Sequence, residues 1–372
     1  GKSFLQGGAT ASNLHQYWND SARCLAAVIG LPMEEVVSRV LAFHRERLDA
    51  VPDLTMYPEL KGYRDRLVAQ ERGMNDAGVE DNLIALSQSL NFWRSTRLLQ
   101  ETGIAYYAQA MPEKCRILYM ADSDRGALHL KNVDDPLTYW TPAPPVAPNT
   151  PWPYTHPLFF DGVGSGLHID EIPPEIFPVD VRPLCQEHCT TVKEAEEFMV
   201  RYNYFWSGQN LLIHDNKGNS VAFEKTSCRV GVRGPNEKGI NFINGMTAVD
   251  PEISAFQKQQ RQKYLDQIGI QWNDSPDGRY FDFSENKMNN MIRYVKELSL
   301  NPTWDNAKQL MEQRDSSGPM CQMGERLHHD QPALEYTLQM LIFEWDNKRM
   351  HLRQWRKDVP VYLDTPEIVS FE

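Results

Sequence analysis

The sequence predicts an α+β protein, with a helical N-terminal segment followed by β-hairpins and further helices. A stripe of apolar residues at helical spacing in the N-terminal part is typical of core packing: Leu83, Leu86, Leu90 and Trp93. Apolar segments joined by turn residues indicate hairpins over residues 115–135 and 210–225. We therefore expect a helical segment over residues 1–114 and a core of sheets and helices over residues 115–372.

Length and composition narrow the class of protein. A chain of 372 residues has room for one large domain or two of ordinary size. The net charge of −12 and the lack of a long lysine or arginine run argue against binding to nucleic acid or to an anionic membrane surface. No apolar segment is long enough to cross a membrane. The six cysteines are sparse, and the chain starts at Gly1, so a cytoplasmic location and export after removal of a signal peptide both stay open.

Three helices are expected in the N-terminal segment. The first begins near Pro32, where the acidic residues Glu34 and Glu35 favour a helix N-terminus. The others are expected over residues 59–71 and 80–99.

The hairpin over residues 115–135 carries the strongest chemical signal. Its first strand is apolar, and Gly126 in the turn is available for a positive φ. The start of the first strand lies beside the end of the second, which is expected to bring four polar side chains together: Cys115, Lys131, Asn132 and Asp134. A thiol, a cation, an amide and a carboxylate at one sheet end can activate a nucleophile and stabilise the charge it creates.

This hairpin resembles the nucleophile hairpin of the N-terminal nucleophile (Ntn) hydrolases, by pattern the penicillin acyltransferase-like family and the choloylglycine (bile salt) hydrolases. In those families Arg-Asn-x-Asp closes the hairpin, whereas here Lys131 replaces the arginine and keeps only its charge. The resemblance implies a four-layer αββα sandwich of two mainly antiparallel sheets, with residues 1–114 as a prosegment. It also implies a small-molecule amide substrate and no cofactor, and it leaves a homo-oligomer open.

The same resemblance implies a mechanism. The base is the α-amino group of Cys115, freed by self-cleavage after Lys114, and such a group titrates at about 7.7–8.0. The Cys115 thiolate attacks an amide carbonyl, and Lys131 supplies positive charge. Asp134 holds the α-amino group or the substrate. The oxyanion is stabilised by backbone N–H groups together with one of two amides, Asn132 or Asn244. The acyl group passes to water, or to an amine if the enzyme is an acyltransferase.

Later segments complete the resemblance. The hairpin over residues 210–225 and a strand ending in an asparagine build the second sheet in the relatives, and Asn244 matches that asparagine; a turn residue before Gly245 is the alternative. Arg261 matches a family arginine on the helix over residues 254–265, and a solvated helix face is the alternative. Further elements are expected as helices over 284–298, with Ser284 as N-cap, and 303–314, and as a strand within 333–345.

A proline-rich run over residues 141–157 cannot be a helix or a central strand. Several aromatic residues surround it: Trp140, Trp152, Tyr154, Phe159 and Phe160. They either wall an apolar pocket beside Cys115, with Trp140 contacting the substrate, or belong to a surface wrap packed on the core. The glycines over residues 162–166 lack the context of a phosphate loop, so a turn is expected there.

Three alternatives remain at this stage. In the first, Cys115 is a buried structural thiol. In the second, the protein is a ligand-binding relative that has lost catalysis. In the third the nucleophile is Cys189, which precedes a helix with Thr191 as N-cap and Glu194 at the capping-box position. A metal site at residues 328–330 is not expected, because adjacent histidines on a strand point to opposite faces.

Overall fold

A computed structural model describes most of the chain. The described residues are 19, 22–23, 25–27, 29–49, 63–97, 101–102, 115–136, 152, 154–164, 181–202, 209–225, 229–245, 247–267, 276–315, 317–325, 335–356 and 359–371. The chain divides into two compact units: residues 1–110 with 172–180 (unit 1), and residues 111–171 with 181–372 (unit 2). The expected cut between residues 114 and 115 is a covalent event and stays a prediction.

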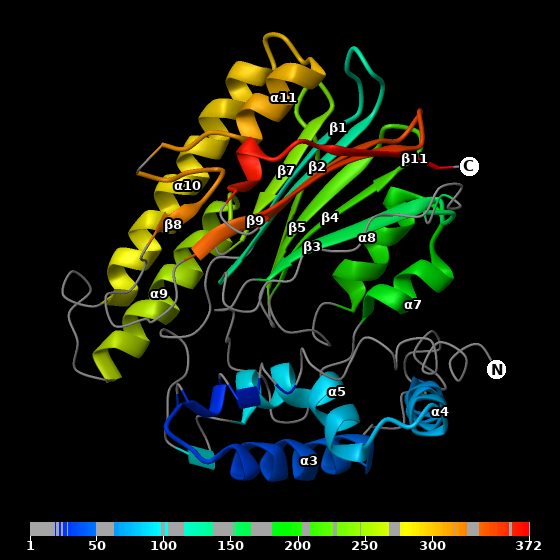
Figure 1. Ribbon diagram of the computed structural model, residues 1–372, viewed down its shortest axis with the longest axis vertical. Coiled ribbons are helices and arrows are strands. Elements are labelled where there is room, and N and C mark those ends of the chain that lie inside the picture. The colour runs from blue at the N-terminus through cyan, green and yellow to red at the C-terminus, as the bar shows by residue number, and fades with distance from the viewer. Residues whose placement is uncertain are drawn as a thin grey trace. The chain divides into compact units, whose positions relative to one another are not determined.

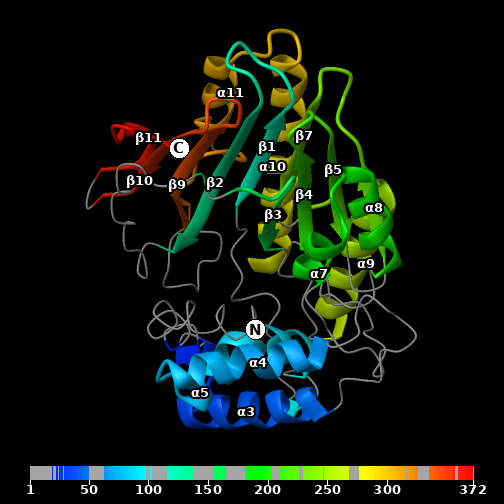
Figure 2. The same ribbon diagram turned by 90° about the vertical axis from the view of Figure 1, so that its right-hand side faces the viewer.

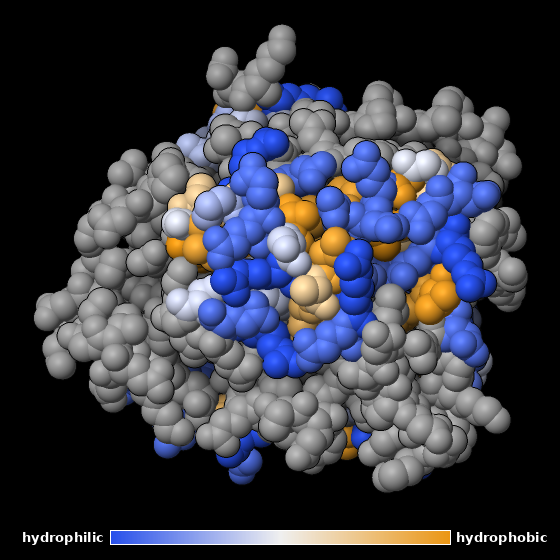
Figure 3. All heavy atoms as spheres, turned by 90° about the horizontal axis from the view of Figure 1, so that it is seen from below, coloured by the Kyte–Doolittle hydropathy of each residue, from blue (hydrophilic) through white to orange (hydrophobic). Residues whose placement is uncertain are grey.

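Unit 1 contains the three expected helices, α3 (Met33–Asp49), α4 (Tyr63–Asp76) and α5 (Asp81–Thr96). Helices α3 and α5 share a buried apolar core that includes Val36, Val40, Phe43, Leu86, Leu90 and Trp93. Three of the four residues of the expected stripe therefore pack as predicted, whereas Leu83 belongs to a smaller cluster with Met74. The face of α3 away from this core is polar, and hydrophilic side chains surround the apolar ones in Figure 3.

A buried histidine ties the three helices of unit 1 together. His44 on α3 contacts the Ser89 hydroxyl on α5 through Nδ1 at 2.8 Å. Its Nε2 lies 3.2 Å from Glu71 Oε1 on α4. Ser89 is fully buried, so this arrangement supports packing and does not present a nucleophile to solvent.

Unit 2 is built on two antiparallel sheets (Figure 1). Sheet A has the order β11-β10-β9-β2-β1-β7, with β8 paired to β9. Its strands are β1 (Arg116–Met120), β2 (Leu128–Pro136), β7 (Ile240–Asn244), β8 (Met323–Glu325), β9 (Glu335–Glu344), β10 (Arg349–Gln354) and β11 (Glu367–Ser370). Sheet B has the order β3-β4-β5-β6. Its strands are β3 (Leu158–Gly164), β4 (Gln209–Asp215), β5 (Ser220–Lys225) and β6 (Val230–Arg233).

Helices pack against both sheets (Figure 2). Helices α10 (Pro276–Leu298) and α11 (Trp304–Met311) share a large apolar core with one face of sheet A. Helix α8 (Val192–Arg201) contacts β4 and β5, while α7 (Val181–His188) contacts α8. Helix α9 (Pro251–Gln267) contacts β6, and a short 3₁₀ helix, η6 (Val361–Leu363), contacts β9 and β10. The structure is therefore α+β with two antiparallel sheets, as expected.

Local signals gave several elements correctly. Thr191 caps α8 in a full capping box with Glu194. Gly126 has a φ of +82° in the β1–β2 turn. The strand expected within residues 333–345 forms as β9, which pairs antiparallel with β10.

Three expectations are wrong. The strand that ends in Asn244, β7, joins sheet A and not the second sheet, because its hydrogen-bonding partner is β1; sheet B ends at its edge strand β6. Of the turn expected over residues 162–166, residues 162–164 are the end of β3, because β4 supplies the partner hydrogen bonds, and residues 165–166 lie outside the described residues. Helix α10 begins at Pro276, so Ser284 is inside it and is not its N-cap.

Candidate functional site

Cys115 lies immediately before β1, at the head of the strand, and is half-buried. It packs against a cluster between the two sheets that contains Ile117 of β1, Val163 of β3 and Ile243 of β7. Its φ is +69°, in the left-handed region that costs a non-glycine residue about 1–3 kcal/mol. Such positions are concentrated at functional sites, so the backbone at Cys115 itself marks this end of the sheet for attention.

Strand pairing decides which side chains share a face with Cys115. Ile117 lies opposite Lys131, and Tyr119 lies opposite His129. Directly opposed residues in an antiparallel pair point to the same side of the sheet. Lys131 and His129 are therefore on the face of sheet A that meets sheet B, as is the Cys115 contact cluster.

Lys131 is the cation of this face. Its Nζ donates to Asp161 Oδ1 on β3 at 2.5 Å. Burial lowers the pKa of Lys131, but the negative charges of Asp161 and of the Cys115 thiolate outweigh burial, so the pKa is raised overall. Lys131 therefore carries its charge beside the thiol, as the sequence predicted from the hairpin alone.

Sequence reasoning missed Asp161 and His129. Asp161 Oδ2 lies 3.0 Å from His129 Nε2, so its two oxygens contact two different residues of β2. Burial raises the pKa of Asp161, but Lys131 and His129 lower it by more, so the net shift is downward. The available signal was the lone acid in the apolar segment Leu158 to Val163. Nothing in the sequence showed that β3 would lie across from β2.

A second polar cluster lies on the opposite face of sheet A. Arg116 pairs in register with both Asn132 and Asn244. Its guanidinium donates to Asp134 Oδ2 at 2.5 Å, and the Thr337 hydroxyl donates to Asp134 Oδ1 at 2.6 Å. All five of these side chains are fully buried.

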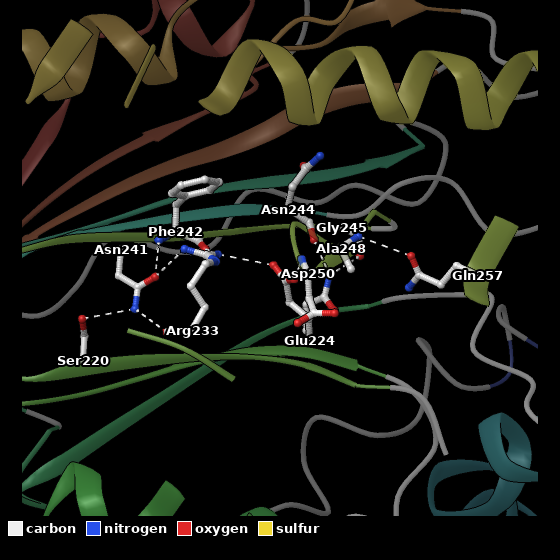
Figure 4. Close-up of polar contacts among 11 residues, drawn as sticks. Ser220, Glu224, Arg233, Asn241, Phe242, Asn244, Gly245, Ala248, Asp250 and Gln257 are labelled. Carbon is white, nitrogen blue, oxygen red and sulfur yellow. Dashed lines mark hydrogen bonds and ion pairs between the residues drawn. The ribbon is translucent and has the colours of Figure 1, made fainter. Parts of the chain in front are cut away.

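The amides of this cluster differ in their partners. Asn132 Nδ2 donates to the carbonyl oxygens of Met311 and Met320, at 2.9 and 2.7 Å. The Asn244 side chain has no hydrogen-bond partner among the described residues, although the backbone carbonyl oxygen of Asn244 accepts from Asn210 Nδ2. In Figure 4 the Asn244 side chain points away from Glu224 and Asp250. The strand register thus puts Lys131 on the face of Cys115, and Asn132, Asp134 and Asn244 on the other. The expected meeting of all four polar side chains of the hairpin is therefore wrong, because successive residues of a strand point to opposite faces.

The strand that ends in Asn244 is held by a polar network (Figure 4). Arg233 of β6 donates to Asn241 Oδ1 at 2.9 Å and pairs with Glu224 of β5 at 3.3 Å. Glu224 Oε2 also accepts from the backbone N–H of Asp250 at 2.7 Å. The network joins β5, β6 and the start of β7 to the segment before α9.

Three of the aromatic residues named near the proline-rich run form one cluster: Trp152, Tyr154 and Phe159. Tyr154 and Phe159 have ring centroids 4.7 Å apart, and Trp152 lies 5.1 Å from Trp345 of the β9–β10 turn. Burial raises the pKa of Tyr154, and the charge of Asp161 adds to the effect. Phe159 of this cluster lies against His129, with ring centroids 4.7 Å apart, so the aromatic cluster adjoins the residue that contacts Asp161.

The remaining candidates divide as follows. Trp140 lies outside the described residues, and Arg261 lies on α9 with a side chain outside them. Cys189 is buried in front of α8, next to Cys185, whose pKa is raised by burial and then by Cys189.

Residues 328–330 are not described. Within the described ranges, no group of three or more His, Cys, Asp or Glu side chains forms a metal site. Nor is any described helix long and apolar enough to span a membrane.

Comparisons with known proteins give distant structural matches only. No protein-family model and no curated protein sequence matches the chain. A mutant of conjugated bile acid hydrolase from Clostridium perfringens matches with 10% identity and a TM-score of 0.38, over 69% of this chain and 96% of that one. Penicillin V acylase from Agrobacterium tumefaciens matches with 9% identity and a TM-score of 0.34, over 68% and 84%. A second variant of the bile acid hydrolase matches with 8% identity and a TM-score of 0.33, over 71% and 86%. These scores assign no family, so the function rests on this chain's own residues.

Proposed function

We propose that the protein is a cysteine Ntn hydrolase that cleaves a linear amide bond through an acyl-cysteine intermediate. The observation that carries the proposal is the head of β1, where the half-buried Cys115 thiol lies on the same sheet face as the charged Lys131. A nearby cation favours the thiolate, which is the nucleophilic form. The proposal includes the four-layer αββα order, in which helices cover the outer faces of two stacked sheets.

The α-amino group of Cys115 is the proposed base. It is released when the same thiol attacks the Lys114 carbonyl, the peptide C–N bond breaks as the acyl group moves from nitrogen to sulfur, and water hydrolyses the resulting thioester. Residues 1–114 would then be the prosegment and residues 115–372 the catalytic core. The thiol proton passes to this amine, the sulfur bonds to the substrate carbonyl, and the amine leaving group takes the proton as the C–N bond breaks. Water then attacks the acyl-cysteine and restores the thiol.

The other predicted residues enter this proposal in two ways. Asn132 and Asp134 support the strand head from the opposite face, since both are committed to partners there. Asn244 lies on that opposite face too; it stays the proposed side-chain donor to the oxyanion, because its amide has no hydrogen-bond partner among the described residues and it stands at the end of the strand that flanks β1, and the proposal requires its amide to reach around that strand end. Arg261 and Trp140 stay proposed substrate contacts.

The test is a screen of N-acyl amides with aliphatic and aromatic acyl groups, run on the wild type, Cys115→Ala and Cys189→Ala. We expect hydrolysis to be lost in Cys115→Ala and kept in Cys189→Ala, which removes a buried thiol as a matched control. Intact mass spectrometry of the same samples checks the cut before Cys115. A single full-length mass in active protein would exclude the free-amine base, and undiminished hydrolysis by Cys115→Ala would exclude the nucleophile. An added amine that captures the acyl group would identify an acyltransferase.

A further inference from the structure

One carboxylate of sheet B reaches the face of sheet A that carries Cys115. Strand β3 presents alternate residues to that face, with Phe159 against His129, Asp161 against Lys131, and Val163 in the cluster that contacts Cys115. Asp161 is therefore the acid on β3 that meets the candidate site. Its side chain keeps only 13% of its surface exposed, so the ion pair with Lys131 is largely shielded from solvent.

Asp161 is itself fixed on its second oxygen. His129 is fully buried, and burial lowers the pKa of its imidazole despite the neighbouring Asp161. A neutral ring must carry its proton on Nε2 to donate to Asp161 Oδ2 at 3.0 Å. The carboxylate thus accepts from His129 on Oδ2, and from Lys131 and the backbone N–H of Gly162 on Oδ1.

We propose that Asp161 is a positioning residue that holds the Lys131 ammonium beside Cys115. This inference rests on the proposed function. A lysine side chain is long and flexible, with about 2 kcal/mol of rotamer entropy, and its ammonium is strongly hydrated. Lys131 retains 19% side-chain exposure, which gives it a route to solvent. Without an acceptor at position 161, the ammonium would turn to water or give up its proton, and in either case its charge beside the thiol would be lost.

The charge of Asp161 has an opposite effect that the test must separate. The charged or titratable groups around Lys131 are Cys115, Asp161, His129 and Tyr154. The negative charge of Asp161 disfavours a thiolate nearby, whereas the position it gives to Lys131 favours one. Asp161→Asn and Asp161→Val both remove the negative charge and have similar volume, but only asparagine keeps an oxygen that can accept from Lys131.

The experiment measures how much Lys131 activates the thiol in each background. Iodoacetamide labelling of the Cys115 peptide is followed by mass spectrometry from pH 5 to 10, with and without Lys131→Met, in the full chain. We expect Lys131→Met to slow labelling at pH 7 several-fold in the wild type and in Asp161→Asn, because an opposite charge within about 4–6 Å favours the thiolate. In Asp161→Val we expect Lys131→Met to change the rate by less than about twofold.

Equal slowing in all three backgrounds would overturn the positioning role, as would no slowing in the wild type. Asp161→Ser, whose hydroxyl is too short to replace the carboxylate, gives the same comparison if the valine variant does not fold. Labelling needs no substrate, so it is independent of the hydrolysis screen. A Cys115→Ala variant that still hydrolyses amides would therefore refute the proposed function without deciding the role of Asp161.

Discussion

Removing the Asp134 carboxylate is expected to destabilise unit 2 by about 3–5 kcal/mol. Asp134 and Arg116 are both fully buried, and the two side chains form an ion pair at 2.5 Å. Asp134→Ala leaves the Arg116 guanidinium buried without its counter-charge, and the Thr337 hydroxyl loses its acceptor. An uncompensated buried charge accounts for most of the cost, and the lost neutral hydrogen bond adds about 1 kcal/mol.

Thermal unfolding measured by circular dichroism checks this magnitude. For 3–5 kcal/mol in a unit of this size we expect the midpoint to fall by roughly 6–20 °C. Thr337→Val is the matched control, because it keeps the ion pair and removes only the hydroxyl, which donates to Asp134 and accepts from the backbone N–H of Gln322; its expected cost is about 2 kcal/mol. A midpoint lowered by less than about 2 °C in Asp134→Ala would refute the reasoning.

The same variants distinguish a supporting role for Asp134 from a catalytic one. Asp134→Asn keeps one oxygen, which can accept from either Arg116 or Thr337, while removing the charge. If Asp134 acts through Arg116, hydrolysis and thermal stability should fall together across the alanine and asparagine variants. If it acts on the α-amino group or the substrate, the asparagine variant should lose more hydrolysis than its lower stability accounts for, measured at a temperature at which the variant is fully folded.

Two further predictions concern folding. Burial lowers the pKa of His214 well below 6.5, so the folded protein takes up this proton less readily than the unfolded chain, and the free energy of unfolding should fall as the pH drops below about 6.5. His214→Phe should therefore flatten the pH dependence of the urea midpoint between pH 7 and 5. An unchanged slope would contradict this expectation. A Cβ at Gly318 would lie 2.6 Å from the backbone nitrogen of Lys287, so Gly318→Ala should cost about 1–3 kcal/mol by urea unfolding. Gly234→Ala is its control, with nothing within 4 Å of the added Cβ, and equal costs in the two variants would count against the clash.

Strand register explains why the hairpin was predictable and its chemistry was not fully so. The turn glycine and the apolar strand set the pairing of Arg116 with Asn132, which put Lys131 near Cys115 as expected. Successive residues of a strand point to opposite faces, so Asn132 lies on the other side from Lys131. The β-bulge between Val133 and Asp134 shifts the register on β9, and Asp134 then pairs with Arg116.

The sequence by itself determined the features that depend on residues close together in the chain: the amphipathic helices of unit 1, the capping box at Thr191, and the β-hairpin that brings Lys131 alongside Cys115. Only the tertiary structure decided which carboxylate meets that lysine, and on which sheet Asn244 ends. The physical reason is that contacts within a hairpin are fixed by local backbone geometry. The packing of β3 against the face of β2, in contrast, follows from the burial of two apolar sheet faces whose strands are far apart in the chain.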